Sequence, residues 1–157
     1  MSTKAQQKAP GAIAVNKQAR RNYEFLETVE AGIALVGSEV KSLRAGRVSF
    51  KDGHVRFKAD GAWLIGVHIA PWEHTGVREA PDPERPRRLL LHKGEIAKLA
   101  AQVEQKGLSV IPAKMYFTRG KVKVQLALGR GKKTHDKRQD IKQRDIDRDT
   151  QRQLAKY

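Results

Sequence analysis

The sequence contains no cysteine, and its apolar runs, such as those at residues 33–36 and 89–91, are only a few residues long. The absence of cysteine excludes disulfides, thiol nucleophiles, zinc sites with cysteine ligands and iron–sulfur clusters. Such short runs cannot cross a bilayer, because a transmembrane helix requires about 20 mostly apolar residues. The N-terminus also lacks the apolar segment of a secretory signal. These absences predict a soluble protein of the cytoplasm.

Acidic residues are few as well. The 157-residue chain has 17 Asp and Glu but 32 Lys and Arg, and its formal net charge is therefore +15. A surface with this charge attracts polyanions, of which RNA and DNA are the commonest. An anionic membrane is the alternative partner, but it requires a basic amphipathic helix or a lipidation signal, and the sequence shows neither. We therefore expect the partner to be a nucleic acid.

The five histidines do not follow the spacing of a metal site or of a metal-dependent hydrolase, since no H-x-x-x-H or H-E-x-x-H pattern occurs. The sequence also contains neither a phosphate-binding G-x-x-x-x-G-K-[ST] loop nor a G-x-S-x-G nucleophile motif. We expect a protein without catalytic residues, metal or cofactor.

Patterned segments between residues 15 and 129 predict several short strands and three helices. Asn16 is placed to cap a first helix of one or two turns over 16–21, and a second helix is expected up to Arg44. Apolar residues at helical spacing predict a third helix over 93–105. Alternating apolar and polar residues lie on both sides of the turn dipeptides Asp60-Gly61 and Arg119-Gly120. This pattern predicts two antiparallel hairpins.

This content predicts a mainly β fold: an OB-like closed antiparallel β-barrel over residues 15–129, with two to three helices. The alternation at Val122 and Val124 leaves Lys121 and Lys123 on the opposite face of their strand, so the outer face of the barrel is expected to be wet and basic. A further strand over residues 23–36 is expected to break at Gly32. Residues 1–14 lack core-forming side chains and are expected to form a flexible arm.

Residues 130–157 form a basic tail with ten Lys and Arg against five Asp. Its few large apolar side chains cannot bury a helical face, so burial cannot offset the entropy lost on ordering. After Arg138, however, there is neither Gly nor Pro to interrupt a helix. We expect a tail that is disordered alone and helical against a polyanion.

Five motifs, taken together, resemble the SmpB (small protein B, SsrA-binding protein) family, whose members partner transfer-messenger RNA in bacterial ribosome rescue. The resemblance extends from about residue 13 to the end of the chain. The motifs are N-K-x-A at 16–19, E-A-G-I-A-L at 30–35, G-S-E-V-K-S-L-R-A-G at 37–46, D-P at 82–83 followed by R-x-R-R-L-L-L-H at 85–92, and G-K-K-x-x-D-K-R at 131–138. One departure is Gly53-His54, where the family more often has Ser-Tyr.

The resemblance implies an OB-like barrel that binds the tRNA-like domain of transfer-messenger RNA. The positions that carry over to the RNA-binding surface are Asn16, Glu30 and Leu90, with Lys17, Arg20 and Arg21 nearby as phosphate contacts. We add Lys41 and Arg44 from the second helix. A carboxylate such as Glu30 repels phosphate, so near RNA we expect it to accept hydrogen bonds from base edges or a 2′-hydroxyl.

The family's tail enters the decoding centre of the small ribosomal subunit and the empty mRNA channel, where it becomes helical. The tail positions that carry over are Lys132, Lys133, His135, Asp136, Lys137, Arg138 and Ile146. The implied function is delivery of transfer-messenger RNA to stalled ribosomes in trans-translation. The implied partners are that RNA, the ribosome and, through the shared RNA, elongation factor Tu; the protein itself is expected to be a monomer.

The residues by themselves leave simpler roles open. From the residues alone, Asn16 is better suited to capping a helix, Leu90 to packing in the core, and Glu30 to a solvated surface. The second helix can turn either a solvated face or an RNA-binding face outward with Glu39, Lys41 and Arg44. Two other functions also remain open at this point, namely a general OB-type binder of structured RNA or the ribosome, and a metal-independent ribonuclease that uses histidine and lysine.

Overall fold

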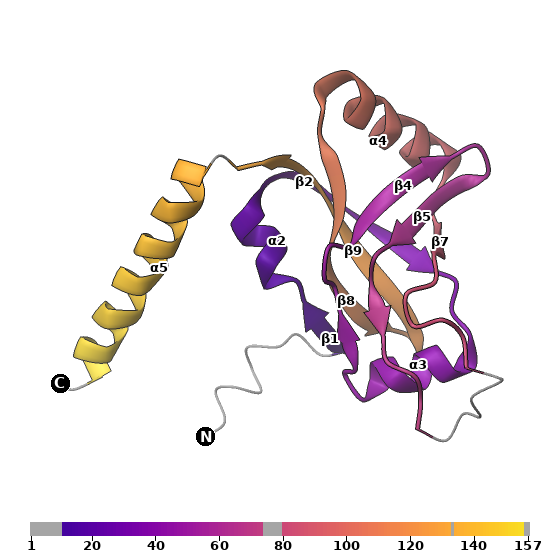
Figure 1. Cartoon of the computed structure of the whole chain (residues 1–157), viewed down its shortest axis with the longest axis horizontal. Coiled ribbons are helices and arrows are strands. Elements are labelled where there is room, and N and C mark those ends of the chain that lie inside the picture. The colour runs from indigo at the N-terminus through magenta and orange to yellow at the C-terminus, as the bar shows by residue number, and fades with distance from the viewer. Residues whose placement is uncertain (1–10, 74–79, 133, 156–157) are drawn as a thin grey trace.

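The computed structural model describes residues 11–73, 80–132 and 134–155. Seven antiparallel strands form one sheet, and helices lie around this sheet (Figure 1). The strands are β1 (Ala12–Val15), β2 (Tyr23–Ile33), β3 (Val48–Ser49), β4 (His54–Lys58), β5 (Gly61–Ile65), β6 (His68–Ile69), β7 (Arg87–Leu90), β8 (Ser109–Thr118) and β9 (Lys121–Gly131). The described helices are α2 (Lys17–Asn22), α3 (Gly37–Arg44), α4 (Lys93–Lys106) and α5 (Thr134–Ala155). The expected class, mainly β and antiparallel, is confirmed.

The order of strands in the large sheet is β1-β8-β9-β2-β7-β5-β4, and β3 pairs with β6 in a separate two-stranded sheet. Both predicted hairpins form. Lys58 lies opposite Gly61 in the β4–β5 hairpin, and Thr118 lies opposite Lys121 in the β8–β9 hairpin. Arg119 and Gly120 have φ angles of 52° and 77°, the left-handed conformation that a tight two-residue turn requires.

Strand β2 does not break at Gly32, contrary to our expectation. It continues to Ile33 because Gly32 lies between two strands, opposite Leu90 of β7 and Lys123 of β9. A Cβ atom at this position would lie 3.1 Å from the Cβ of Leu90. The glycine therefore allows two strands to approach closely rather than ending one of them.

The core lies on the inward faces of the strands. Met115, Val124 and Leu126 are completely buried there, and Leu43 of α3 and Leu99 of α4 pack into the same cluster. A second, smaller cluster lies where α2 covers β8 and β9; its buried members are Ala19, Ile111, Ala113 and Ala127. Helix α2 is therefore fixed to the sheet by small side chains, which let its backbone lie close to the strands.

Two expectations for the ends of the chain need correction. The flexible arm was expected to reach residue 14, but residues 12–14 belong to β1, which satisfies the free edge of β8. Residues 134–155 of the tail form α5, so the described residues contain four helices rather than two to three, and the expected disorder of the tail in the free protein stays a prediction. The helix has local support, since Gln143 Nε2 donates to Asp147 Oδ1 at 3.0 Å, one turn away.

Helix α5 stands apart from the sheet, and α2 is the element beside it (Figure 1). Its described side chains from Lys142 to Arg152 are all exposed. Among the described residues, no helix combines the length and the apolar character that crossing a membrane requires.

Candidate nucleic-acid interface

Helix α2 carries three of the predicted contacts, and Asn16 holds it in place. The Asn16 side chain is only 6% exposed; its Nδ2 donates to the Pro112 carbonyl at 2.8 Å, and its Oδ1 accepts from the Ala19 N–H at 3.1 Å. The predicted cap is thus confirmed. Because both polar groups of the amide are engaged inside the protein, the structure places Asn16 beneath the surface, and its contact with RNA stays a prediction.

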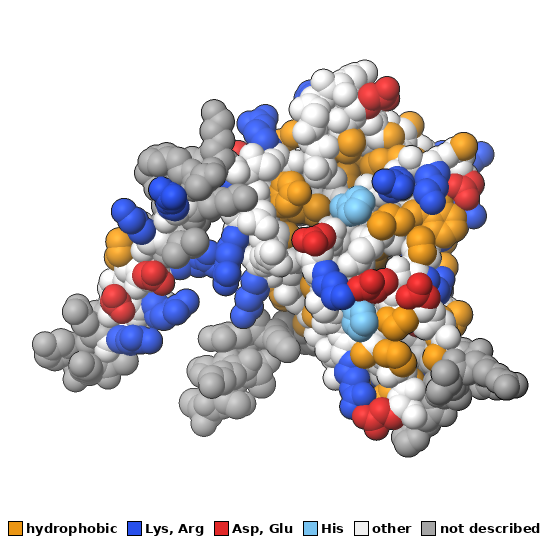
Figure 2. Space-filling view, in the orientation of Figure 1, with side chains coloured by type: hydrophobic (Ala, Val, Ile, Leu, Met, Phe, Trp, Pro, Cys, Tyr) orange, Lys and Arg blue, Asp and Glu red, His pale blue; other side chains and the backbone are white. Residues whose placement is uncertain are grey.

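The cations of α2 lie on the surface. Lys17, Arg20 and Arg21 are exposed, and none of them forms an ion pair with another described residue. The Arg20 guanidinium lies over the Phe25 ring, 5.9 Å from its centroid, which restricts its position. Figure 2 shows Lys and Arg side chains gathered where α2 faces α5. This group of unpaired cations can receive a phosphate backbone.

The outer face of the sheet begins beside α2 and carries two rows of side chains. One row runs across the strands from Glu30 through Gln125 to Lys114. The next row runs from Leu90 past Gly32 and Lys123 to Tyr116. Glu30 and Leu90, which are 60 residues apart in the chain, are thus neighbours on one surface. We call this surface the outer strip; its members are Glu30, Leu90, Lys114, Tyr116, Lys123 and Gln125.

Glu30 is exposed, and its Oε2 accepts a hydrogen bond from the Tyr116 hydroxyl. Burial, this hydrogen bond and the charge of Glu30 raise the pKa of Tyr116 to about 12. The hydroxyl therefore remains a donor at neutral pH and holds the carboxylate in one orientation. The other carboxylate oxygen, Oε1, has no partner among the described residues and can accept a further hydrogen bond.

Leu90 is 57% exposed, whereas its neighbour Leu89 is 2% exposed. The alternative in which Leu90 packs in the core is therefore wrong, because the strand places alternate side chains on opposite faces. Leu90 lies in a groove that is also lined by Gly32, Leu35, Val40 and Lys123. The lining of the groove thus combines apolar side chains with the cations Lys121 and Lys123.

Helix α3 borders this groove. Val40 lines it, while Lys41 and Arg44 are exposed on the same helix, and the Arg44 guanidinium lies 5.6 Å from the centroid of the Phe117 ring. The structure thus places α2 and α3 next to the two ends of the outer strip.

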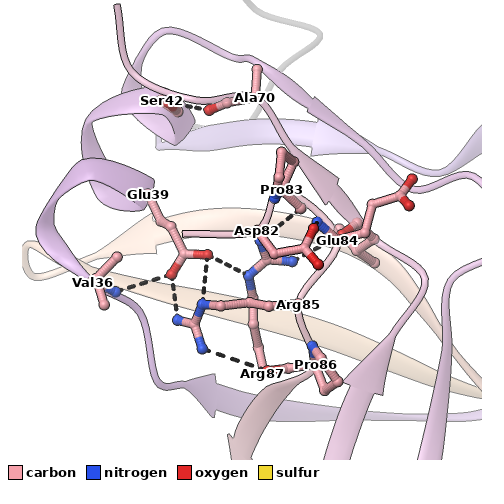
Figure 3. Close-up of polar contacts among 11 residues, drawn as sticks. Val36, Glu39, Ser42, Ala70, Asp82, Pro83, Glu84, Arg85, Pro86 and Arg87 are labelled. Atoms are coloured by element: carbon pink, nitrogen blue, oxygen red, sulfur yellow. Dashed lines mark hydrogen bonds and ion pairs between the residues drawn. The ribbon is translucent and has the colours of Figure 1, made fainter. Parts of the chain in front are cut away.

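Glu39, which our sequence interpretation placed either on a solvated helix face or in contact with RNA, is buried at 3% exposure. Figure 3 shows its carboxylate between two arginines: Arg87 Nε donates to Oε2 at 2.7 Å, and Arg85 donates to both oxygens at 3.1 and 2.5 Å. The Val36 N–H donates to Oε1 at 3.0 Å, which caps α3. No local signal in the sequence pairs Glu39 with these arginines, because they lie 46 and 48 positions later in the chain.

The network also explains why α3 stays beside β7. Arg87 is completely buried; its Nη1 donates to the Val67 carbonyl at 2.8 Å and its Nη2 donates to the Pro83 carbonyl at 2.9 Å. Together with the bond from Nε to Glu39, each of its three guanidinium nitrogens therefore has a hydrogen-bond partner, which a buried charge requires. Because α3 and β7 supply Val40 and Leu90, this network fixes the two sides of the groove.

We predict a pH effect from Glu39. Burial alone raises the pKa of Glu39, but hydrogen bonds from Arg85, the Val36 N–H and Arg87 outweigh it and bring that pKa below its ordinary value of 4.5. A lowered pKa stabilises the folded state above pH 4.5, and this contribution is lost as the pH falls through the folded-state pKa. In urea titrations, the stability gap between wild type and Glu39→Gln should therefore be largest near neutrality and narrow below about pH 4.5. A constant gap would contradict this.

The predicted tail residues are not brought to the outer strip. Lys132 lies just after β9. Its Nζ donates a hydrogen bond to the Arg20 carbonyl at 3.2 Å, and its backbone N–H donates to the Asn22 carbonyl at 2.8 Å. The first residues of the tail therefore contact α2. Arg138 and Ile146 are exposed on α5. Lys133 lies outside the described residues. His135, Asp136 and Lys137 belong to α5, but their side chains lie outside the description.

Within the ranges that the structure describes, no group of three His, Asp or Glu side chains could hold a metal ion. What the described surface offers is therefore a set of cations, one oriented carboxylate and an apolar groove on neighbouring elements.

Comparison with known proteins gives consistent matches over nearly the whole chain. The family pattern described as SmpB protein matches residues 13–156. An SsrA-binding protein of Nitratidesulfovibrio vulgaris strain DP4 is 59% identical over 152 residues, which cover 96% of this chain and 98% of the relative. One of Nostoc punctiforme is 54% identical over 145 residues, which cover 92% and 94%.

Among solved structures, a chain from the study "tmRNA-SmpB: a journey to the center of the bacterial ribosome" is 52% identical. It superposes with a TM-score of 0.66 and covers 80% of this chain and 87% of that chain. The sequence motifs, the fold and these matches agree, and the chain belongs to the SmpB family.

Proposed function

We propose that the protein binds the tRNA-like domain of transfer-messenger RNA and delivers this RNA to stalled ribosomes for trans-translation. Relatives of nearly equal length are named for binding SsrA, and the similar solved chain comes from a study of transfer-messenger RNA and SmpB in the ribosome. These names describe binding rather than catalysis. The observation in this chain that supports the proposal best is the placement of unpaired cations, Glu30 and Leu90 along one continuous surface.

Some residues of this surface contribute mainly to the affinity for RNA, and others contribute to the selectivity for one RNA. Lys17, Arg20 and Arg21 supply charge for phosphate oxygens, which attracts any RNA. Glu30, held by Tyr116, offers Oε1 to a base edge or a 2′-hydroxyl, which only an RNA of matching shape can present. Leu90 and its groove offer an apolar contact, which excludes water from the same region.

We further propose that the large sheet curls into a closed, OB-like barrel. Strand β4, at one end of the sheet order, packs against β8, the second strand from the other end. A closed barrel would support the outer strip from beneath on a rigid core and leave no long free edge.

The tail is proposed to act on the ribosome, in the vacant decoding centre and mRNA channel. Its exposed cations, which include Arg138, Lys142 and Arg148, suit a channel lined by phosphate, and residues 134–155 can form one helix that presents them. We expect the protein to act in the cytoplasm as a monomer and to reach elongation factor Tu through the shared RNA.

The direct test is a competition gel shift with the full chain. We expect tight binding to the tRNA-like domain of transfer-messenger RNA and weaker binding to an ordinary tRNA or an unrelated hairpin of equal charge. Equal affinity for all three would favour the general structured-RNA binder instead. Replacing both Arg20 and Arg21 by alanine should weaken binding and reduce the slope of log affinity against log salt by about 2, since each phosphate contact contributes about 1.

A matched control removes two exposed cations away from the outer strip. Lys98 and Lys106 lie on α4, and both are exposed. Their double alanine variant has the same net charge as the Arg20/Arg21 variant. A salt slope that changes equally in both variants would contradict the proposed role of α2.

A further inference from the structure

The outer face of the sheet continues past Leu90, over β7, β5 and β4. Arg56, Trp63 and Arg88 lie opposite one another on these three adjacent strands, and so form a third row of side chains. Adjacent strands are about 4.8 Å apart, so the row places a partly exposed indole between two exposed guanidinium groups. Arg88 and Leu90 point to the same face of β7, which connects this row with the outer strip.

The indole of Trp63 is held in a defined position. Its Nε1 donates to Asp60 Oδ1 at 3.0 Å, and the Lys58 ammonium lies 5.5 Å from the ring centroid. Arg88 Nη2 donates to the Asp60 carbonyl at 2.8 Å. Arg56, Lys58 and Arg88 form no ion pair with another described residue, although the Asp60 carboxylate lies nearby. Figure 2 shows basic, acidic and apolar side chains together over the β4–β5 hairpin.

A groove leads from this cluster back toward Leu90. It lies between β7 and the start of α4, and its lining includes Gly61, Arg88, Leu90, His92 and Ile96. The cluster and the outer strip are therefore parts of one path over the surface, with Arg88 at the junction.

We propose that Arg56, Lys58, Trp63 and Arg88, the tryptophan patch, form a further contact for single-stranded RNA. An unpaired base stacks on the indole of Trp63, and the flanking phosphates lie against the three cations. A rigid aromatic ring among cations is the arrangement with which proteins hold single strands, because every base has a flat π face. An acidic peptide could use the cations but would gain nothing from the fixed ring. The proposal rests on the proposed function, because it extends the same RNA surface beyond Leu90.

The experiment uses the fluorescence of Trp63 in the full-length chain. The chain has two tryptophans, so Trp72→Phe leaves Trp63 as the only reporter. We expect single-stranded heptauridylate to quench this fluorescence in a saturable way, because a stacked base quenches an indole. Arg88→Ala should raise the dissociation constant obtained from the quenching curve several-fold. Lys106→Ala, the matched loss of one exposed cation, should change this constant by less than twofold. Trp63→Ala should weaken heptauridylate binding, measured by anisotropy, about 5- to 100-fold.

Several outcomes would contradict the proposal that the tryptophan patch binds single-stranded RNA. They are the absence of quenching at saturating heptauridylate, equal losses for Arg88→Ala and Lys106→Ala, and displacement of the RNA by hexaglutamate at equal concentration of charge. Since the quenching assay keeps Trp63 intact, a folding defect of Trp63→Ala cannot produce these outcomes. A parallel gel shift with the tRNA-like domain separates the two proposals: if the wild type binds that domain but Trp63 is not quenched by heptauridylate, only this inference fails.

Discussion

Replacing Glu39 by alanine is expected to lower the free energy of unfolding by about 3–5 kcal/mol, the usual cost of breaking a buried ion pair from one side. The reason is Arg87, which is 0% exposed and would keep its charge without the carboxylate at 2.7 Å that now balances it. Arg85 and the N–H of Val36 would lose the same acceptor. Urea unfolding, followed by circular dichroism, measures the loss.

The matched control is Glu27→Ala. Glu27 also forms an ion pair, with Lys98 at 2.9 Å, but its side chain is 43% exposed. Exposed pairs contribute about 0–1 kcal/mol, because water and salt already screen them. If Glu39→Ala cost no more than Glu27→Ala, the network in Figure 3 would not stabilise the fold in the way we infer.

Removal of residues 134–157 is expected to abolish peptide tagging on stalled ribosomes while leaving affinity for the tRNA-like domain within about twofold. The reason is spatial: α5 stands apart from the sheet, and the outer strip lies on β2, β7, β8 and β9. Ending the chain after Lys133 keeps Lys132, whose backbone and ammonium bind α2. A reconstituted translation assay on an mRNA without a stop codon measures tagging, and a gel shift measures RNA binding.

A triple variant tests which part of the tail matters. Replacing Asp136, Lys137 and Arg138 by alanine should reproduce the loss of tagging. Replacing Lys142, Asp147 and Arg148, which lie further along α5 and are exposed, removes the same three residue types and should reduce tagging much less. Normal tagging by the truncated chain would contradict the role in the decoding centre, and equal losses in the two triple variants would contradict the role of positions 136–138.

Local features of this molecule were predictable because they depend on near neighbours in the chain. The Asn16 cap follows from an amide placed three residues before an unsatisfied N–H. The turn at Arg119-Gly120 follows from Gly120, which adopts positive φ without steric cost. Gly107 ends α4 in the left-handed conformation, with φ of 64°, for the same kind of reason.

Errors arose where distant segments decide the outcome. Glu39 looks like a solvated helical residue until Arg85 and Arg87, 46 and 48 positions later, fold over it. Gly32 looks like a strand breaker until it is seen between Leu90 and Lys123.

By itself, the sequence determined the charge, the positions of most strands and helices, and the family, because these depend on composition, periodicity and motifs along the chain. Only the tertiary structure decided which side chains share a surface. Sheet register brings Glu30, Leu90 and Lys123 together and turns Leu90 outward, and burial converts Glu39 from a surface charge into the partner of two arginines. The physical reason is that register and burial are set by contacts between segments far apart in the chain, and no local pattern contains them.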